Sequence, residues 1–298
     1  MHLGSVAVAD ADGKLIASTG DPERVSFARS SMKPLQASVS LTFIEDELPD
    51  PEVAVMCASH NGESVHLDAV RSLLRRAGLD VDALRCPPMR PLDEESALAV
   101  PEPRPEYHNC SGKHAGMLLA CVRGGFPTDS YLDPEHPLQQ AVLSTVTAAA
   151  GEEPSAIGVD GCGVPVHALP LGAMATVFAR LVSGAVERAD VAVAAMRSAP
   201  YLVGGRDRVC TAVMEVADVI VKVGAEGLVC AGLRGEGLGV AIKIEDGNPR
   251  ALDPAILHAL RLLGVTDDPS LERFARPPVL GGGRPVGNLL PVFDLQRH

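Results

Sequence analysis

The sequence has no tryptophan, and aromatic residues make up only 3% of its 298 positions. It therefore offers few of the aromatic surfaces on which proteins stack nucleic-acid bases, and no aromatic platform for a carbohydrate. Basic residues are also in the minority, since 26 Lys and Arg stand against 38 Asp and Glu and the formal net charge is −12. A chain with this charge is not expected to bind nucleic acid or an anionic membrane.

Long apolar runs are missing as well. No run of about 18 apolar residues occurs, so no membrane-spanning helix is expected. The first residues also lack the basic and apolar segments of a secretory signal. The seven cysteines form an odd set without compact spacing, which favours reduced thiols and a cytoplasmic protein.

What is present suits a folded chain with a sizeable core. The sequence is 46% hydrophobic and 21% charged, as is usual for globular proteins. Its length allows one large domain or two intermeshed ones. We expect residues 1–298 to form a single unit, with a helical subregion at about 64–216.

Apolar periodicity and the placement of Gly and Pro predict strands near both chain ends and helices between them. A hairpin is expected at 5–17, and further strands at 53–57, 218–223, 227–233 and 238–244. Helices are predicted at 32–43, 64–77, 112–122, from Asp133 onward, and at 171–183, 187–198, 207–216 and 253–264. The tail from Pro277 is expected to fray or to dock in an extended form. This order favours an α+β fold, with a mixed or antiparallel sheet built from both chain ends beside a helical part.

The most informative stretch is 29–34, with the sequence RSSMKP. Positions three apart share a helix face, so Ser30 and Lys33 are expected to point to the same spot. A neutral lysine can take the proton of a serine, as in acyl-transfer enzymes with a Ser-x-x-Lys motif. The start of a helix disfavours an ammonium group and would lower the lysine pKa. A capped helix with a surface lysine would have the same pattern, so the motif alone does not decide.

Two further segments carry polar groups. Ser59 follows the apolar run 53–57 and could be a second hydroxyl in a proton relay, although the Asn-Gly at 61–62 also fits a simple turn. The segment 109–116 (NCSGKHAG) lacks the upstream glycine and the Ser or Thr of a phosphate-binding loop, which excludes nucleotide binding of that kind. It gathers Cys110, Lys113 and His114 at a predicted helix start, where a thiol pKa is lowered. A capped helix with a buried thiol is the alternative.

Two more segments follow. In the glycine-rich segment 158–165 (GVDGCGVP), Asp160 is an acceptor suited to an α-amino group, and Cys162 could join Cys110 at a soft metal. Two distant cysteines are weak evidence for zinc, which normally takes three or four ligands. Lys222, two residues before a glycine on a predicted strand, is similar to the Lys-Thr-Gly of penicillin-recognising enzymes. A lysine that protects an edge strand would look the same.

In this order, the five segments resemble the Rhizobium-type asparaginase family, often called asparaginase II. The resemblance runs from about residue 2 to 290 and is carried by RSSMKP, CASHNGE at 57–63, NCSGKHAGM at 109–117, VDGCGVP at 159–165, KVGAEG at 222–227 and GLGVAIKIEDG at 237–247. It implies a fold related to serine β-lactamases and glutaminases. It also implies a homodimer that hydrolyses the side-chain amide of L-asparagine to L-aspartate and ammonia, without an organic cofactor.

The resemblance also implies roles for individual residues. Ser30 would be the nucleophile with Lys33 as its base, and Ser59 and Lys222 would form a second Ser–Lys tandem. The stretch 184–222 is compact, which leaves Lys243 as a possible substitute for Lys222. The residues implied in substrate binding are Arg29, His60, His114 and Asp160. Those that match the positions of a pocket-shaping zinc ion are Cys110, Lys113 and Cys162.

Other readings remain open from the sequence. The same Ser–Lys chemistry would serve a glutaminase, an esterase or a peptidase. A zinc hydrolase would use Cys110 and Cys162 as ligands and activate water at the metal. An amino-acid binding protein would use the same pocket without turnover.

Overall fold

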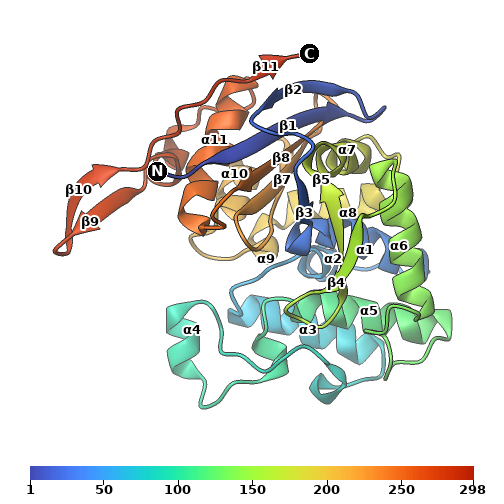
Figure 1. The fold of residues 1–298 in the computed structure, drawn as a ribbon. Helices are drawn as coiled ribbons and strands as arrows, with labels where there is room; N and C mark the ends of the chain where they lie inside the picture. Colours follow the sequence, from blue (N-terminus) through green and yellow to red (C-terminus); the bar gives the residue numbers. More distant parts are fainter.

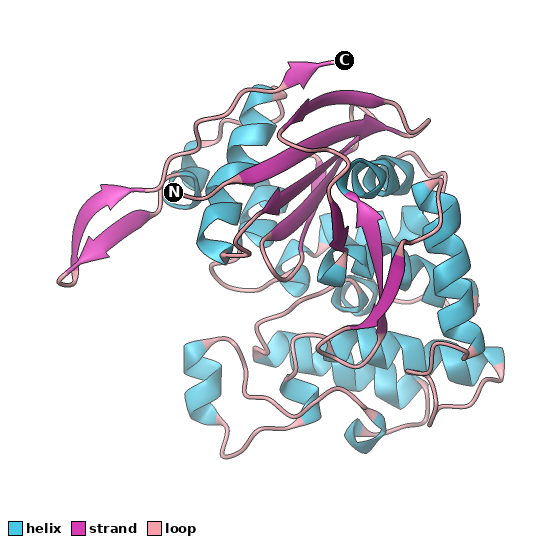
Figure 2. Cartoon of the chain, viewed as in Figure 1, coloured by secondary structure: helices cyan, strands magenta, loops and turns pink.

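The computed structural model describes all 298 residues as a six-stranded sheet next to a group of helices (Figures 1 and 2). The strand order is β11-β2-β1-β8-β7-β6, and every neighbouring pair is antiparallel. The strands are β1 (Gly4–Asp10), β2 (Leu15–Thr19), β6 (Val219–Val223), β7 (Leu228–Leu233), β8 (Leu238–Ile244) and β11 (Gln296–Arg297). The predicted α+β fold, with an antiparallel sheet built from both chain ends, is confirmed. No helix combines the length and hydropathy needed to cross a membrane.

Helices cover this sheet closely. Helix α7 (Leu171–Val182) packs on β1, β7 and β8, and α11 (Leu252–Leu262) packs on β7 and β8. Gly239 on β8 permits the approach of α7, because a Cβ atom there would lie 1.8 Å from the carbonyl oxygen of Ala175. At this position only glycine lets the helix backbone rest directly on the strand.

The remaining strands form two smaller sheets. One has the order β3-β5-β4 and the other is a hairpin of β9 and β10, which extends away from the body of the molecule (Figure 1). Their bounds are β3 (Val25–Phe27), β4 (Ala156–Val159), β5 (Pro165–Pro170), β9 (Pro278–Gly281) and β10 (Arg284–Asn288). The tail from Pro277 therefore continues as this hairpin and ends in β11 at the edge of the large sheet.

The helical part surrounds a buried central helix, α2 (Asp50–Met56), which contacts α1, α3, α5, α8 and α9. These neighbours are α1 (Lys33–Thr42), α3 (Ser64–Arg76), α5 (Ser111–Gly124), α8 (Ala189–Ser198) and α9 (Pro200–Val203), and α6 (Pro137–Ala150) and α10 (Val209–Val216) complete the group. The short elements are η1 (Arg29–Met32), η2 (Val81–Ala83), α4 (Glu94–Ala99), η3 (Pro105–Tyr107), η4 (Pro249–Ala251), η5 (Pro269–Leu271) and α12 (Glu272–Ala275).

Two predictions of local structure are wrong. The run 53–57 is not a strand but the end of α2, because neighbouring helices bury it on every side and Val53, Ala54 and Val55 have no exposed surface. Such a short apolar run has no periodicity that separates a buried strand from a buried helix. The helix predicted from Asp133 begins only at Pro137, where the His136 side chain accepts the backbone N–H of Leu138. Asp133 instead closes a preceding turn by accepting the N–H of Glu135.

Candidate active site

The hydroxyl of Ser59 lies between two buried lysine amines. Lys33 Nζ donates a hydrogen bond to Ser59 Oγ at 3.0 Å, and Lys222 Nζ donates one to the same oxygen at 2.9 Å. The exposed fractions of Lys33, Ser59 and Lys222 are 0%, 5% and 1%. A lysine is rarely buried without an anionic partner, so this arrangement of two amines on one hydroxyl is a candidate for chemistry.

Three separate parts of the chain supply these groups. Lys33 is the first residue of α1, Ser59 lies in the loop between α2 and α3, and Lys222 lies near the end of the edge strand β6. Backbone bonds fix the Ser59 loop, since its N–H donates to the carbonyl of Val203 at 3.0 Å. The lysines are held by carbonyls as well: Lys33 Nζ donates to Ala58 O at 2.5 Å and Lys222 Nζ to Val223 O at 2.8 Å.

The two amines are not independent. Burial, together with the charge of Lys33, lowers the pKa of Lys222 to about 7. Both causes disfavour a second ammonium group in this dry space. At neutral pH Lys222 is therefore divided between its charged and neutral forms, which is the condition under which an amine transfers protons well.

Ser30 lies three residues before Lys33 and makes no hydrogen bond to this cluster. The structure shows no hydrogen bond between Ser30 Oγ and Lys33 Nζ, contrary to the sequence-based expectation. The reason is that Lys33 Nζ directs its N–H groups to Ala58 O, Ser59 Oγ and, at 3.5 Å, Asn109 O. Ser30 belongs to the turn η1 before α1 and is half-buried, whereas Ser31 is fully buried and donates to Ala28 O at 2.6 Å. Ser30 is thus the serine of this pair that a small molecule can reach.

The residue before Ser30 adopts an uncommon backbone conformation. Arg29 has a φ angle of 50°, a region that residues other than glycine seldom occupy. Its side chain is held by two carboxylates, with Nε at 2.7 Å from Asp160 Oδ1 and Nη1 at 2.9 Å from Glu226 Oε1. These ion pairs connect η1 with the glycine-rich loop and with the turn after β6, and so bring three of the predicted segments together.

Asp160 is held in its ionised form. Burial alone would raise its pKa, but the charges of Lys113 and Arg29 outweigh burial and leave the pKa below its usual value. Its Oδ1 atom also accepts the N–H of Gly161 at 2.9 Å. A buried carboxylate that stays charged is suited to bind an ammonium group.

Close to Asp160 lies a group of two thiols and an amine. Lys113 Nζ donates to Cys162 Sγ at 3.1 Å, and Cys162 Sγ lies 3.7 Å from Asp160 Oδ2. Interaction with Cys162 and the charges of Lys33 and Lys113 hold the pKa of Cys110 well below that of an ordinary thiol, against the effect of burial. Although burial opposes the charge of Lys113, its pKa is raised by the neighbouring Cys162, Cys110 and Asp160.

The donor atoms of this group bear on whether it can hold a metal ion. No three side chains among His, Cys, Asp and Glu gather as metal ligands, but the two thiols are donors that zinc accepts, and Lys113 could join them only after losing its proton. His114 lies close enough to Cys162 for that thiol to affect the pKa of the imidazole, and the Nε2 atom of His114 is buried without a hydrogen-bond partner. The set of Cys110, Lys113 and Cys162 therefore fits a soft divalent ion.

The two predicted substrate-binding histidines lie behind the site. His60 and His114 have no exposed surface. His60 Nε2 bonds to Ser111 Oγ at 3.0 Å and its ring stacks on His66, whereas His114 Nδ1 bonds to the Tyr131 hydroxyl at 2.7 Å. The geometry therefore gives no support to direct contact between these rings and a substrate.

Of the two lysines considered for the second tandem, the structure places Lys222 beside Ser59. Lys243 lies on β8, where its Nζ donates to the carbonyls of Glu226 at 2.5 Å and Ile244 at 2.9 Å. Its amine makes no hydrogen bond to a serine.

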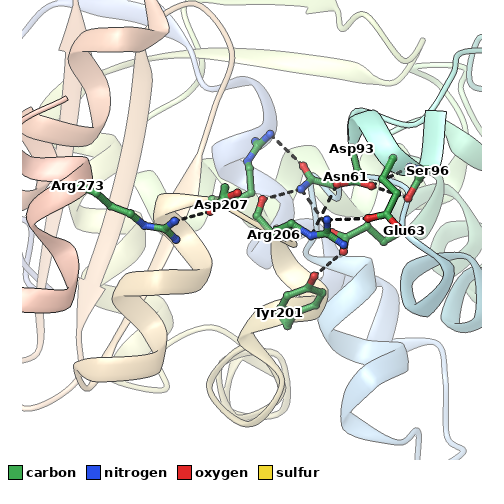
Figure 3. Close-up of polar contacts among 10 residues, drawn as sticks. Asn61, Glu63, Asp93, Ser96, Tyr201, Arg206, Asp207 and Arg273 are labelled. Carbon is green, nitrogen blue, oxygen red and sulfur yellow. Dashed lines mark hydrogen bonds and ion pairs between the residues drawn. The ribbon is translucent and has the colours of Figure 1, made fainter. Parts of the chain in front are cut away.

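Sequence reasoning missed a polar cluster next to Ser59, which Figure 3 shows around Asn61. Asn61 Nδ2 donates to the carbonyl of Arg206 at 2.9 Å, and Arg208 Nη1 donates to Asn61 Oδ1 at 3.4 Å. The available signal was the Ser-x-Asn spacing of residues 59 and 61, which accompanies Ser-x-x-Lys in some penicillin-recognising enzymes. No signal along the chain indicated Arg208, which reaches this place only through the fold.

Comparison with known proteins gives a family for this chain. A family model described as L-asparaginase II matches residues 1–291. A search of curated proteins found no match. Among solved structures, the chain is similar to a β-lactamase from Mycobacterium bovis, with 16% identity, a TM-score of 0.48 and coverage of 86% of this chain and 93% of that one. It is also similar to a mutant of simvastatin synthase from Aspergillus terreus, with 13% identity, a TM-score of 0.44 and coverage of 83% and 88%.

Proposed function

Because this chain belongs to the L-asparaginase II family, we propose that it hydrolyses the side-chain amide of L-asparagine to L-aspartate and ammonia with its serines and lysines. The observation that carries this mechanism is the Ser59 hydroxyl, which accepts hydrogen bonds from two buried amines, one of them with a pKa of about 7. An amino-acid binding protein would gain nothing from two buried amines, because their desolvation destabilises the folded state.

In the proposed first step Ser30 is the nucleophile, because it is the accessible serine. Its oxygen forms a bond to the amide carbon while its proton passes to Lys33, once Lys33 has given up a proton through Ser59 to the neutral Lys222 amine. Ser30 Oγ must turn toward Lys33 Nζ for this transfer, and the bound substrate would hold it there. Backbone N–H groups near the start of α1 would stabilise the oxyanion, each by about 3 kcal/mol.

The leaving nitrogen must then receive a proton. Ser59 Oγ supplies it as the carbon–nitrogen bond breaks, and Lys33 or Lys222 returns a proton to Ser59 along the bonds of 3.0 and 2.9 Å. Ammonia departs and leaves an ester between Ser30 and the aspartyl group. Water, losing its proton to a neutral lysine, cleaves this ester and restores the serine.

The experiment that tests this proposal measures ammonia release from L-asparagine and L-glutamine by the purified protein, together with mass spectrometry of the protein quenched during turnover. We expect faster release from asparagine and an adduct of one aspartyl group on the peptide that contains Ser30. Ser30→Ala should abolish both the adduct and turnover, whereas Ser59→Ala should still form the adduct slowly. An adduct on Ser59 instead, or full activity of Ser30→Ala, would overturn the mechanism.

We further propose that Cys110, Lys113 and Cys162 hold a zinc ion that shapes the wall of the pocket beside Asp160. When bound, the ion would supply positive charge next to that carboxylate, and no proton transfer in the proposed mechanism passes through it. Metal analysis of the purified protein should find about one zinc per chain, and Cys162→Ser should lower this content. Retention of full zinc content by Cys162→Ser would contradict the assignment.

A further inference from the structure

Arg208 is a half-buried guanidinium without an anionic partner, at the wall of an open cleft of about 720 Å³. The cleft lies between the segment that contains α4 and the turn at 206–208, and Asn61 forms part of its wall. The hydrogen bond of Arg208 within the protein is the long one to Asn61 Oδ1, at 3.4 Å. Asp253 lies nearby, but it forms no ion pair with Arg208.

Most of the other charged groups of the cleft wall are paired, although Glu94 makes no ion pair. Arg206 pairs with Glu95 at 2.9 Å, and Asp207 pairs with Arg273 at 2.5 Å. Figure 3 shows Asp207 directed toward Arg273. Arg208 is therefore the guanidinium of this cleft that remains available, and its planar pair of N–H donors matches a carboxylate.

Arg208 is also close to the catalytic cluster. The backbone of Ser59 and Asn61 runs alongside residues 203–204, since Ser59 N donates to Val203 O and Asn61 N to Gly204 O, both at 3.0 Å. The charge of Arg208 is near enough to lower the pKa of Lys222. One end of this cleft therefore adjoins the proton-transfer groups.

The position of Asn61, and through it that of Arg208, is fixed by a buried carboxylate. Glu63 Oε1 accepts the N–H of Arg206 at 3.0 Å and the Asn61 amide at 3.4 Å, and the Tyr201 hydroxyl donates to Glu63 Oε2. Gly205 has a φ angle of 106°, and a Cβ atom there would lie 2.3 Å from Glu63 Oε1. The loop thus approaches Glu63 as closely as its backbone allows, which holds Arg208 in place.

We propose that Arg208 binds the α-carboxylate of the amino-acid substrate, while Asp160 binds its α-amino group. This inference rests on the proposed asparaginase function. Arg29, the other guanidinium near the site, already holds two carboxylates. Lys33 and Lys222 are occupied with Ser59. Arg208 is the cation that is left for the substrate, and it makes the enzyme selective for free asparagine over asparagine with a blocked carboxylate.

The test compares two substrates that differ only in the α-carboxylate: L-asparagine and 3-aminopropanamide. Arg208→Gln should lower kcat/KM for asparagine by about 10- to 100-fold, the value of one charged hydrogen-bond pair, and should change kcat/KM for 3-aminopropanamide by less than about threefold. Rates are compared at the high-pH plateau of each variant, because loss of Arg208 also raises the pKa of Lys222 and shifts both profiles equally.

Two variants serve as controls. Arg206→Gln removes a neutralised guanidinium from the same cleft and should change neither substrate by more than about threefold, and Arg208→Lys should recover part of the loss on asparagine. Inhibition by L-aspartate should weaken in Arg208→Gln, whereas inhibition by 3-aminopropanoate should not. Equal losses on both substrates would overturn the role of Arg208 and leave the asparaginase function intact. No ammonia from asparagine with the wild-type protein would overturn the function and the inference together.

Discussion

Lys222 and Lys113 are both almost fully buried within one site, yet the protein shifts their pKa values in opposite directions. For Lys222, burial and the charges of Lys33 and Arg208 outweigh the opposite effect of Cys210 and Cys110, and its hydrogen-bond partners are only hydroxyl and carbonyl oxygens. Lys113 has Asp160 and two thiols around it, and remains an ammonium. Both lysines are buried, so the charges of their neighbours decide which of the two amines can act as a base.

The same difference separates two halves of the site. Around Ser59 no carboxylate bonds to the buried amines, and protons can move among them. Around Asp160 the charges are paired, and the groups there are suited to hold a ligand or an ion in place. The geometry thus separates the proton-transfer groups from the paired charges, although Arg29 is only one position from Ser30 and four positions from Lys33.

The largest effect is expected from Lys222→Met, which removes the base-forming amine without leaving a charge unpaired. We expect kcat to fall by about 10²- to 10⁴-fold, the range typical for loss of a general acid or base. Lys243→Met, which removes a lysine from a neighbouring strand, is the matched control and should keep kcat within about threefold. Steady-state ammonia release gives kcat for both variants. Equal losses of kcat would show that Lys222 has no specific role in proton transfer.

The pH dependence of activity sharpens the comparison. If the neutral form of Lys222 is required, kcat should be low at acid pH, reach half of its plateau near the pKa of about 7, and remain high above it, because the amine loses its proton as the pH rises. The profile is measured with saturating asparagine between about pH 5 and 9. A profile that falls across neutral pH would mean that the ammonium form is the active one.

A smaller effect, on stability rather than on turnover, is expected on the binding wall. Lys113→Met leaves Asp160 and the thiol pair without their ammonium, and breaking such a buried pair costs about 3 kcal/mol of unfolding free energy. Lys222→Met should cost less, because it relieves repulsion from Lys33. Urea unfolding of both variants, with a chelator present so that no metal contributes, gives the two values. A larger loss for Lys222→Met would reverse the comparison.

The sequence alone predicted much of the site because its chemistry is carried by short motifs. Five residues of the candidate site fall in segments that stood out by residue type, and the fold brings these segments together. They are Ser30, Lys33, Ser59, Asp160 and Lys222. The bonding within the cluster could not be predicted, since Lys33 turns toward Ser59 through contacts made across the fold. Arg208 was missed for a related reason. A single arginine in a sequence carries no signal, and only the structure shows that it has no ion-pair partner while the neighbouring Arg206 has one.

The fold was predicted best where alternating or helical periodicity was clear. Strands 219–223, 228–233 and 238–244 and helices such as 64–76 lie where they were expected. The helix 50–56 was taken for a strand because complete burial removes the pattern that distinguishes the two. The β4 and β5 strands lay hidden in a glycine-rich segment, where the pairing with β3 rather than local preference determines the structure.

Ser59 Oγ accepts hydrogen bonds from two amines, and this has a consequence for the direction in which the hydroxyl can donate its own proton. A hydroxyl oxygen has two lone pairs and one hydrogen, and here both lone pairs are taken by amines. The hydrogen is left with the one remaining tetrahedral direction, away from both lysines. The hydroxyl is therefore oriented as a donor away from both lysines before any substrate arrives, and in the proposed mechanism this is the donor that would meet the leaving nitrogen.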